Sequence, residues 1–160
     1  MAKLAIVSED TVRKIVTRGL AFDAVRAAYE AVALDRAKVF DVVIGTGLND
    51  GEAFAIKSGV DRENEMVGLK CGTYWAGNYD LGLPAHGSTI LLLDPKTGFP
   101  TALVNANYLN GFRTAAGDAI AVHVREAEYV GFQRTMGIYA ALFIAETQAG
   151  NAKIIDRRLL

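Results

Sequence analysis

Residues 87–116 read GSTILLLDPKTGFPTALVNANYLNGFRTAA, and this stretch decides the fold class of the chain. Residues 88–93 form a continuous apolar run, which is typical of a buried strand. The turn-forming residues DPKTG at 94–98 separate this run from a second one at 100–105. The pattern therefore predicts an antiparallel hairpin.

A helix is expected directly after the hairpin. Asn105 or Asn107 can cap its first turn. Apolar residues then recur at helical spacing on one face, namely Leu109, Phe112, Ala116 and Ile120. Arg113 falls on the first turns of this helix, close to the end of the second strand.

The preceding part of the chain contains helical segments first and strands afterwards. Ser8 or Asp10 can cap a short helix over about residues 10–18, and a second helical face carries Phe22, Val25, Tyr29 and Val32. The period then changes, because VFDVVI, EAFAIKSG and MVGLKCGTYW are short runs rich in β-formers, separated by Gly, Asn and Asp. Residues 77–87 read as an irregular loop, a type of segment that often borders a site.

These segments predict an α/β fold of the α+β type, a mostly antiparallel sheet with N- and C-terminal helices packed on it and no Rossmann module. With 160 residues, we expect one domain over residues 1–160. A last helix at about 131–149 is apolar over much of its circumference. It is expected to pack on the sheet and on a second subunit, which predicts a homodimer.

The composition excludes several classes of function. The formal net charge is −1 and no basic run is present, so no attraction to nucleic acid or to an anionic membrane is expected. The first ten residues become polar too soon for a signal peptide, and no apolar stretch approaches the ~20 residues of a membrane span. We therefore predict a cytoplasmic protein. Cys71 is the single cysteine, so we expect a small buried apolar residue and no cysteine-rich metal cluster.

Three stretches together resemble the ornithine cyclodeaminase/μ-crystallin family: VGLKCGTYWAGN, LPAHGSTILLLDPKTGFPTALVNANYL and FRTAAGDAIAV. The resemblance extends from the N-terminus to about residue 125. It implies a two-domain protein in which an α/β dimerisation and substrate-binding domain is joined to a Rossmann domain that holds NAD or NADP. In that arrangement the chain returns to the first domain at its end, which is the role expected for residues 131–149.

The sequence departs from the family where the cofactor domain should begin. The RTAA helix is followed by HVREAEYVGFQRTMGIYAALF rather than by a strand, a glycine turn and a helix. The string most similar to a dinucleotide fingerprint begins at Gly45-Thr46-Gly47, but Asp50 stands at the position of the third glycine and no helix is expected afterwards. We interpret this string as a plain turn and expect no cofactor to be bound by this chain.

Two cations are the first candidates for a substrate site. Lys70 lies on a predicted strand and Arg113 near a helix start, and both can bind the same anion. The guanidinium of Arg113 can donate two parallel hydrogen bonds, and the ammonium of Lys70 supplies a compact charge. The resemblance implies that they bind the carboxylate of an amino or imino acid. Lys57, on a neighbouring predicted strand, can join them. The competing interpretation is a set of solvated or salt-bridged surface residues.

Other chemical residues carry weaker expectations. His86 lies beside the expected cleft and is interpreted as a structural loop histidine, and His123 as a partly buried or dimer-facing residue. Two histidines this far apart predict no metal site. Tyr74 and Trp75 can line a pocket or belong to the core.

The family also offers a further arginine in the strand region after the second helix. VFDVVIGTG contains none, and Lys38 is the nearest cation.

The leading hypothesis is a dimerisation and small-carboxylate-binding domain that is catalytically silent alone, with no catalytic residue assigned. The alternative is an NAD(P)-dependent cyclodeaminase, imino-acid reductase or amino-acid dehydrogenase whose cofactor site is unconventional or supplied by another chain. A third hypothesis is an oligomerisation module without a ligand.

Overall fold

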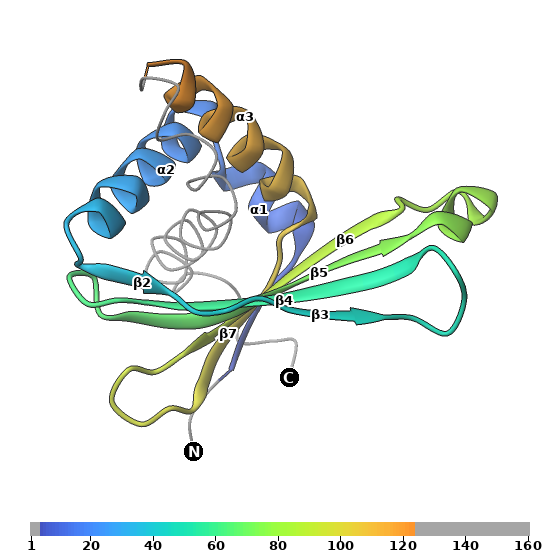
Figure 1. The fold of residues 1–160 in the computed structure, drawn as a ribbon, viewed down its shortest axis with the longest axis horizontal. Helices are drawn as coiled ribbons and strands as arrows, with labels where there is room; N and C mark the ends of the chain where they lie inside the picture. The colour runs from blue at the N-terminus through green and yellow to red at the C-terminus, as the bar shows by residue number, and fades with distance from the viewer. Residues whose placement is uncertain (1–3, 124–160) are drawn as a thin grey trace.

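The computed structural model of the protein describes residues 4–123, which form one sheet with helices on it (Figure 1). In chain order the elements are β1 (Ala5–Val7), α1 (Glu9–Ile15), α2 (Arg18–Ala33), β2 (Ala37–Val39), β3 (Val43–Thr46), β4 (Glu52–Asp61), β5 (Met66–Trp75), the 3₁₀ helix η1 (Ala76–Leu81), β6 (His86–Leu93), β7 (Pro100–Asn105) and α3 (Asn107–His123). The predicted helix at 131–149 lies outside the described residues. None of the helices that the structure describes is long and apolar enough to cross a bilayer.

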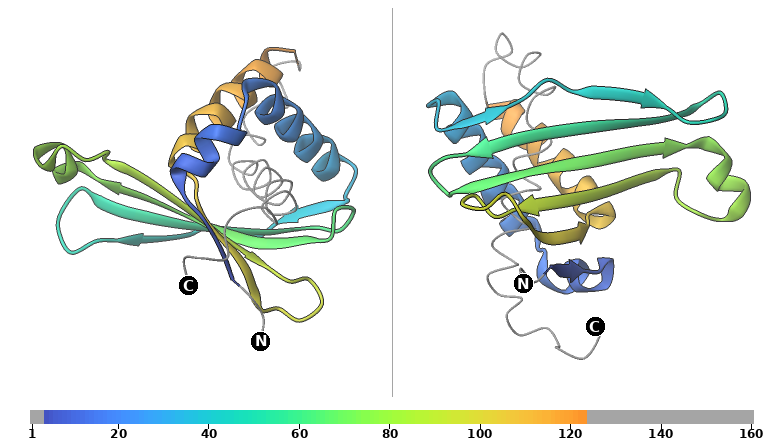
Figure 2. Two further views of the ribbon diagram at one scale, coloured as in Figure 1. Left: turned by 180° about the vertical axis from the view of Figure 1, so that it is seen from behind. Right: turned by 90° about the horizontal axis from the view of Figure 1, so that it is seen from below.

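The sheet confirms the predicted fold class. Its strand order is β1-β7-β6-β5-β4-β2, and β3 pairs with β4 beside β2. Every pair is antiparallel except β1 with β7. The three α helices lie against one face of this sheet, as the two further views also show (Figure 2).

The structure corrects several predicted boundaries. The N-terminal strand β1 was not predicted, since three residues are too few to show a period. The run VFDVVI is divided into the end of β2 and the start of β3, with a break at 40–42. The expected loop at 77–87 consists largely of η1, and His86 already begins β6.

The core lies between the helices α2 and α3 and the two strands of the β6–β7 hairpin. The largest fully buried side chains belong to Val25, Ile90, Val104 and Leu109. The predicted apolar face of α3 is confirmed, because Leu109, Ala116 and Ile120 are buried and Phe112 packs against the core cluster. Burial of each large aliphatic side chain stabilises the fold by about 1.5–3 kcal/mol.

Side chains at helix starts fix how the helices sit on the sheet. Ser8 caps α1 and Thr17 caps α2, each accepting a backbone N–H three residues ahead. Asn105 Oδ1 accepts the backbone N–H of Asn107 at 3.1 Å. Asn107 Oδ1 accepts the backbone N–H of Ser88 at 2.6 Å, so its side chain holds the start of α3 against β6.

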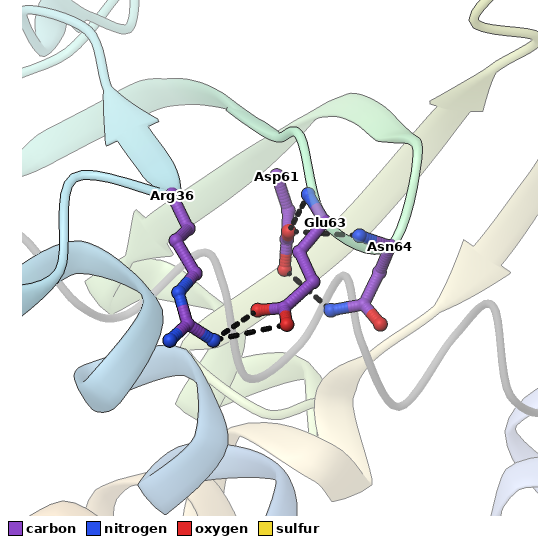
Figure 3. Close-up of polar contacts among 4 residues, drawn as sticks. All are labelled: Arg36, Asp61, Glu63 and Asn64. Carbon is purple, nitrogen blue, oxygen red and sulfur yellow. Dashed lines mark hydrogen bonds and ion pairs between the residues drawn. The ribbon is translucent and has the colours of Figure 1, made fainter.

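The turn between β4 and β5 is built around a buried carboxylate (Figure 3). Asp61 is only 3% exposed, and its Oδ1 accepts the backbone N–H groups of Glu63 and Asn64 at 3.0 and 3.1 Å. Its Oδ2 accepts Asn64 Nδ2 at 2.9 Å. Arg36, just before β2, donates to both carboxylate oxygens of Glu63 at 2.9 Å. This turn sets the register in which β4 and β5 pair.

One end of the sheet extends beyond the helices (Figure 1). This strand arm comprises β3, the paired ends of β4 and β5, η1 and the segment leading into β6. Its exposed large apolar side chains are Val43, Ile44, Leu48, Tyr74, Tyr79, Leu81 and Leu83. Such a concentration of exposed apolar groups is typical of an interaction surface.

Candidate functional site

Two lysines face each other on the central strands. Lys57 of β4 and Lys70 of β5 are direct antiparallel partners. Lys70 is in turn the partner of Ile90, a fully buried core residue, so both lysines lie on the sheet face that the helices cover. Lys70 is only 7% exposed. Like charges directly opposite each other in a sheet are destabilising, so their placement needs a reason.

Helix α3 brings an arginine and an amide to the same place. Lys70 Nζ donates to Asn110 Oδ1 at 2.6 Å, and Arg113 Nη2 donates to the same oxygen at 3.1 Å. Asn110 and Arg113 are three residues apart on the helix and therefore share a face. The single amide oxygen thus holds an ammonium and a guanidinium side by side.

These groups line a cavity of about 290 Å³ where the strand arm meets the helices. The lining residues are Ile44, Ala53, Phe54, Ala55, Lys57, Lys70, Gly72, Thr73, Tyr74, His86, Gly87, Asn110 and Arg113. The lining includes three cationic side chains, Lys57, Lys70 and Arg113, together with His86, and it contains no Asp or Glu. Within residues 4–123, no ion pair links any of the three cations to a carboxylate.

Burial lowers the pKa of all three cations, and the positive charges of neighbouring groups lower the pKa of the two lysines further. Burial, followed by the charges of Arg113 and Lys57, lowers the pKa of Lys70 from 10.5 to about 7. Burial and the charge of Arg113 lower the pKa of Lys57. Burial also lowers the pKa of Arg113, against the opposing effects of Tyr29 and Asp118. The site therefore stores electrostatic free energy that a bound anion would release.

One donor at the site has no acceptor. Arg113 Nε is buried and has no hydrogen-bond partner among the described residues. Ser88 Oγ, near the start of β6, is also buried without a hydrogen-bond partner among the described residues. Buried polar groups are nearly always satisfied, so an unpaired guanidinium nitrogen beside a cavity indicates a missing acceptor. A carboxylate supplies two acceptor oxygens in the geometry that a guanidinium binds best.

The structure thus brings together all three residues that the sequence singled out, Lys57, Lys70 and Arg113. It adds Asn110, which sequence reasoning missed. The available signal was its spacing of three residues before Arg113 on a helix. An asparagine at the start of a helix is more often a cap, and nothing local indicates its contact with Lys70, forty residues earlier.

The remaining predicted residues are divided between the cavity and its surroundings. His86 is the first residue of β6 rather than a loop residue, and its ring lies beside that of Tyr74 with centroids 4.8 Å apart. Both line the cavity, whereas Trp75 does not. Cys71 is half-buried rather than buried. Lys38 lies over the ring of Phe40 and does not line the cavity.

The glycine string at 45–47 does not form a dinucleotide turn. Gly45 and Thr46 end β3, and Gly47 closes a hairpin by donating to the backbone carbonyl of Glu52. The next element is the strand β4, not a helix, so the interpretation as a plain turn is correct. In the part of the chain that the structure describes, no group of three His, Cys, Asp or Glu side chains is arranged to hold a metal ion.

A second, larger groove of about 940 Å³ runs between α2 and α3. Its walls include Phe22, Tyr108, Phe112 and several small residues, and its charged groups are Arg18 and Asp23. Arg18 and Asp23 carry opposite charges, and both lie in the N-terminal half of α2. This groove offers apolar area but no convergent chemical groups, so the cation-lined cavity is the candidate site.

Comparison with known proteins places this chain in a family. The iminosuccinate reductase of Paracoccus denitrificans is 34% identical over 119 residues, which are 74% of this chain and 37% of the relative. The alanine dehydrogenase of Archaeoglobus fulgidus is 30% identical over 116 residues, 72% of this chain and 35% of the relative. The chain thus spans little more than a third of the length of these curated relatives.

Solved structures agree with the sequence comparison. The crystal structure of the Paracoccus denitrificans iminosuccinate reductase in complex with NAD⁺ matches with a TM-score of 0.70 over 74% of this chain and 37% of that one. The Thermococcus litoralis Δ¹-pyrroline-2-carboxylate reductase, at 24% identity and a TM-score of 0.70, shares the fold. A model of the ornithine cyclodeaminase/mu-crystallin family matches residues 7–150. The chain belongs to this family.

Proposed function

We propose that this chain is a dimerisation and small-carboxylate-binding domain and that it is catalytically silent on its own. The carrying observation is the cavity in which Lys57, Lys70 and Arg113 converge: no Asp or Glu lines it, and among the described residues none of the three forms an ion pair with a carboxylate. Such a cluster is costly to fold, and an amino or imino acid carboxylate would compensate it.

We expect no catalysis by this chain alone because the family reaction needs a bound nicotinamide cofactor. Hydride transfer requires a nicotinamide held against the substrate carbon, and the protein contributes binding and orientation. In residues 4–123 the segment most similar to a glycine fingerprint is a hairpin turn, and no group there is placed to hold a dinucleotide by that motif. The proposal therefore assigns residues to substrate binding only.

Calorimetric titration with butyrate, a simple monocarboxylate, tests the binding site. Arg113→Met removes the bidentate fork and keeps most of the apolar stem, so we expect butyrate affinity to fall at least about tenfold, the effect of one charged hydrogen bond. Lys96→Met, in the exposed turn between β6 and β7, is the matched control and leaves the affinity unchanged. Equal affinities for wild type and Arg113→Met would refute carboxylate binding at this site.

The strand arm supports the proposed homodimer. Val43 is 59% exposed on this arm, next to the still more exposed Ile44. Light scattering should give twice the 17.2 kDa of one chain. Val43→Glu places a charge on the arm and should yield monomers, whereas Leu34→Glu, equally exposed at the end of α2, should not. A monomer mass for the unmodified chain would contradict the dimer.

The relatives favour a second candidate, an NAD(P)-dependent cyclodeaminase, imino-acid reductase or amino-acid dehydrogenase whose cofactor site is unconventional or supplied by another chain. The solved iminosuccinate reductase and an archaeal alanine dehydrogenase are titled as complexes with NAD, and the Thermococcus litoralis reductase is titled as a complex with NADH. Fluorescence titration with NADH distinguishes the two candidates. Reduction of a cyclic imine with NADPH by the purified chain would establish the enzyme, and tight NADH binding would remove the reason for expecting a silent domain.

A further inference from the structure

We propose that the ligand of this site is a small dicarboxylate and that Lys57 is the residue that selects the second carboxylate. The inference rests on the proposed function, because it names the class of carboxylate that the same cavity takes. It follows from the number, the pairing and the placement of the cations.

The charges do not balance with a monocarboxylate. Arg113 and Lys70 are sufficient to hold one carboxylate, as a fork and a compact charge. Lys57 would then remain as an uncompensated cation opposite Lys70 on the adjacent strand. A second carboxylate removes this repulsion, whereas a single one leaves most of it in place.

Hydrogen bonds to Asn110 join Lys70 and Arg113 into a pair and leave Lys57 separate. Asn110 Oδ1 joins Lys70 and Arg113, which therefore act together at one end of the cavity. Lys57 has no hydrogen bond or ion pair with any of the residues 4–123. Its half-buried ammonium lines the same cavity and is the donor that remains available to a second anionic group.

The lining also disfavours the other common kind of charged substrate. No Asp or Glu lines the cavity, so the side-chain ammonium of a diamino acid would find three cations and no anionic partner. The volume of about 290 Å³ lies at the lower end of the range for ligand sites, which suits a molecule with a short carbon chain. A four-carbon skeleton with a carboxylate at each end satisfies both conditions.

Calorimetric titrations with three probes at one ionic strength test the inference. Succinate and butyrate share a four-carbon skeleton and differ by one carboxylate, and L-ornithine carries an additional ammonium. For the unmodified chain we expect succinate to bind at least about tenfold more tightly than butyrate, the effect of one charged hydrogen bond, and ornithine more weakly than either.

Two variants then assign the preference to one residue. Lys57→Met keeps the apolar stem and should reduce the ratio of succinate affinity to butyrate affinity to about one. Lys57→Arg should retain the preference for succinate, and Lys96→Met should match the unmodified chain.

The failure of this inference and the failure of carboxylate binding give different results. Equal binding of succinate and butyrate by the unmodified chain, or a preference for succinate that Lys57→Met retains, overturns the dicarboxylate inference and leaves carboxylate binding intact. Absence of binding by all three probes overturns both. The comparison of probes on the unmodified chain decides the question even where Lys57→Met does not fold.

Discussion

Replacing Lys70 by methionine should stabilise the fold while it destroys the binding site. Lys70 is 7% exposed, and its pKa falls from the ordinary value of 10.5 to about 7 in the folded protein. Each pKa unit corresponds to about 1.4 kcal/mol, so at pH 7 the buried ammonium lowers the free energy of unfolding by roughly 4 kcal/mol. Loss of the hydrogen bond to Asn110 costs about 1 kcal/mol. We therefore expect Lys70→Met to be more stable by roughly 3 kcal/mol.

The dependence of this gain on pH identifies its origin. Between pH 7 and 10.5 the unfolded chain keeps the Lys70 proton and the folded chain releases it, so the stability of the unmodified protein rises with pH in this window. The advantage of Lys70→Met should therefore shrink as the pH rises and disappear near pH 10. Lys57 and Arg113 are present in both proteins, so the difference between the two reports mainly on Lys70.

Urea unfolding at several pH values between 7 and 10 measures the effect. The slope of free energy against urea should be unchanged, because the surface exposed on unfolding is nearly the same. Lys96→Met, an exposed lysine in a turn, should show no such pH-dependent gain. A Lys70→Met protein that is less stable than the unmodified one at pH 7, or a difference that does not change with pH, would refute the electrostatic argument.

Three further predictions concern the core, the β4–β5 turn and the proton balance of binding. Leu109→Ala should lower the free energy of unfolding by about 2–5 kcal/mol, because it leaves a cavity under α3, and a loss below about 1 kcal/mol in urea would contradict this. Asp61→Ala removes the acceptor of three hydrogen bonds and should cost about 2 kcal/mol, whereas Arg36→Ala breaks only an exposed ion pair and should cost less than about 1 kcal/mol; equal thermal shifts would be inconsistent with the burial of Asp61. Succinate binding at pH 8 should take up close to one proton as the pKa of Lys70 rises, which calorimetry in buffers of different ionisation enthalpy would detect; binding without proton uptake would contradict a neutral Lys70 in the free site.

Stability and binding are opposed at this site. The like-charge pair on β4 and β5 weakens the fold, and a bound anion would compensate it. A ligand that binds only the folded state should therefore raise the midpoint of thermal unfolding. Replacements that relieve the repulsion should stabilise the chain and weaken binding, a trade-off that is common at functional sites.

The sequence predicted the elements whose signals are local. The hairpin of β6 and β7 follows from two apolar runs around DPKTG, and α3 from the helical spacing of Leu109, Ala116 and Ile120. The strand β1 could not be predicted in this way. It has three residues, and it is defined by parallel pairing with Ala102 to Val104, almost a hundred residues later.

The same distinction applies to the candidate site. The residue types and the resemblance of the chain singled out Lys57, Lys70 and Arg113, because cations in those positions can bind a carboxylate. Their convergence depends on the register of β4 and β5 and on the placement of α3, which the β4–β5 turn and the contact of Asn107 with Ser88 fix. Neither the burial of Lys70 nor the role of Asn110 has a local signal.

The sequence by itself thus determined the fold class, the family and the residues capable of binding an anion. These depend on composition, period and motif, which are properties of neighbouring residues. Only the tertiary structure decided that three cations line one cavity, that the pKa of Lys70 falls to about 7 there and that Lys57 forms no ion pair with the other described residues. Burial and charge–charge distance are set by contacts between segments far apart in the chain, and they determine the electrostatics of the site.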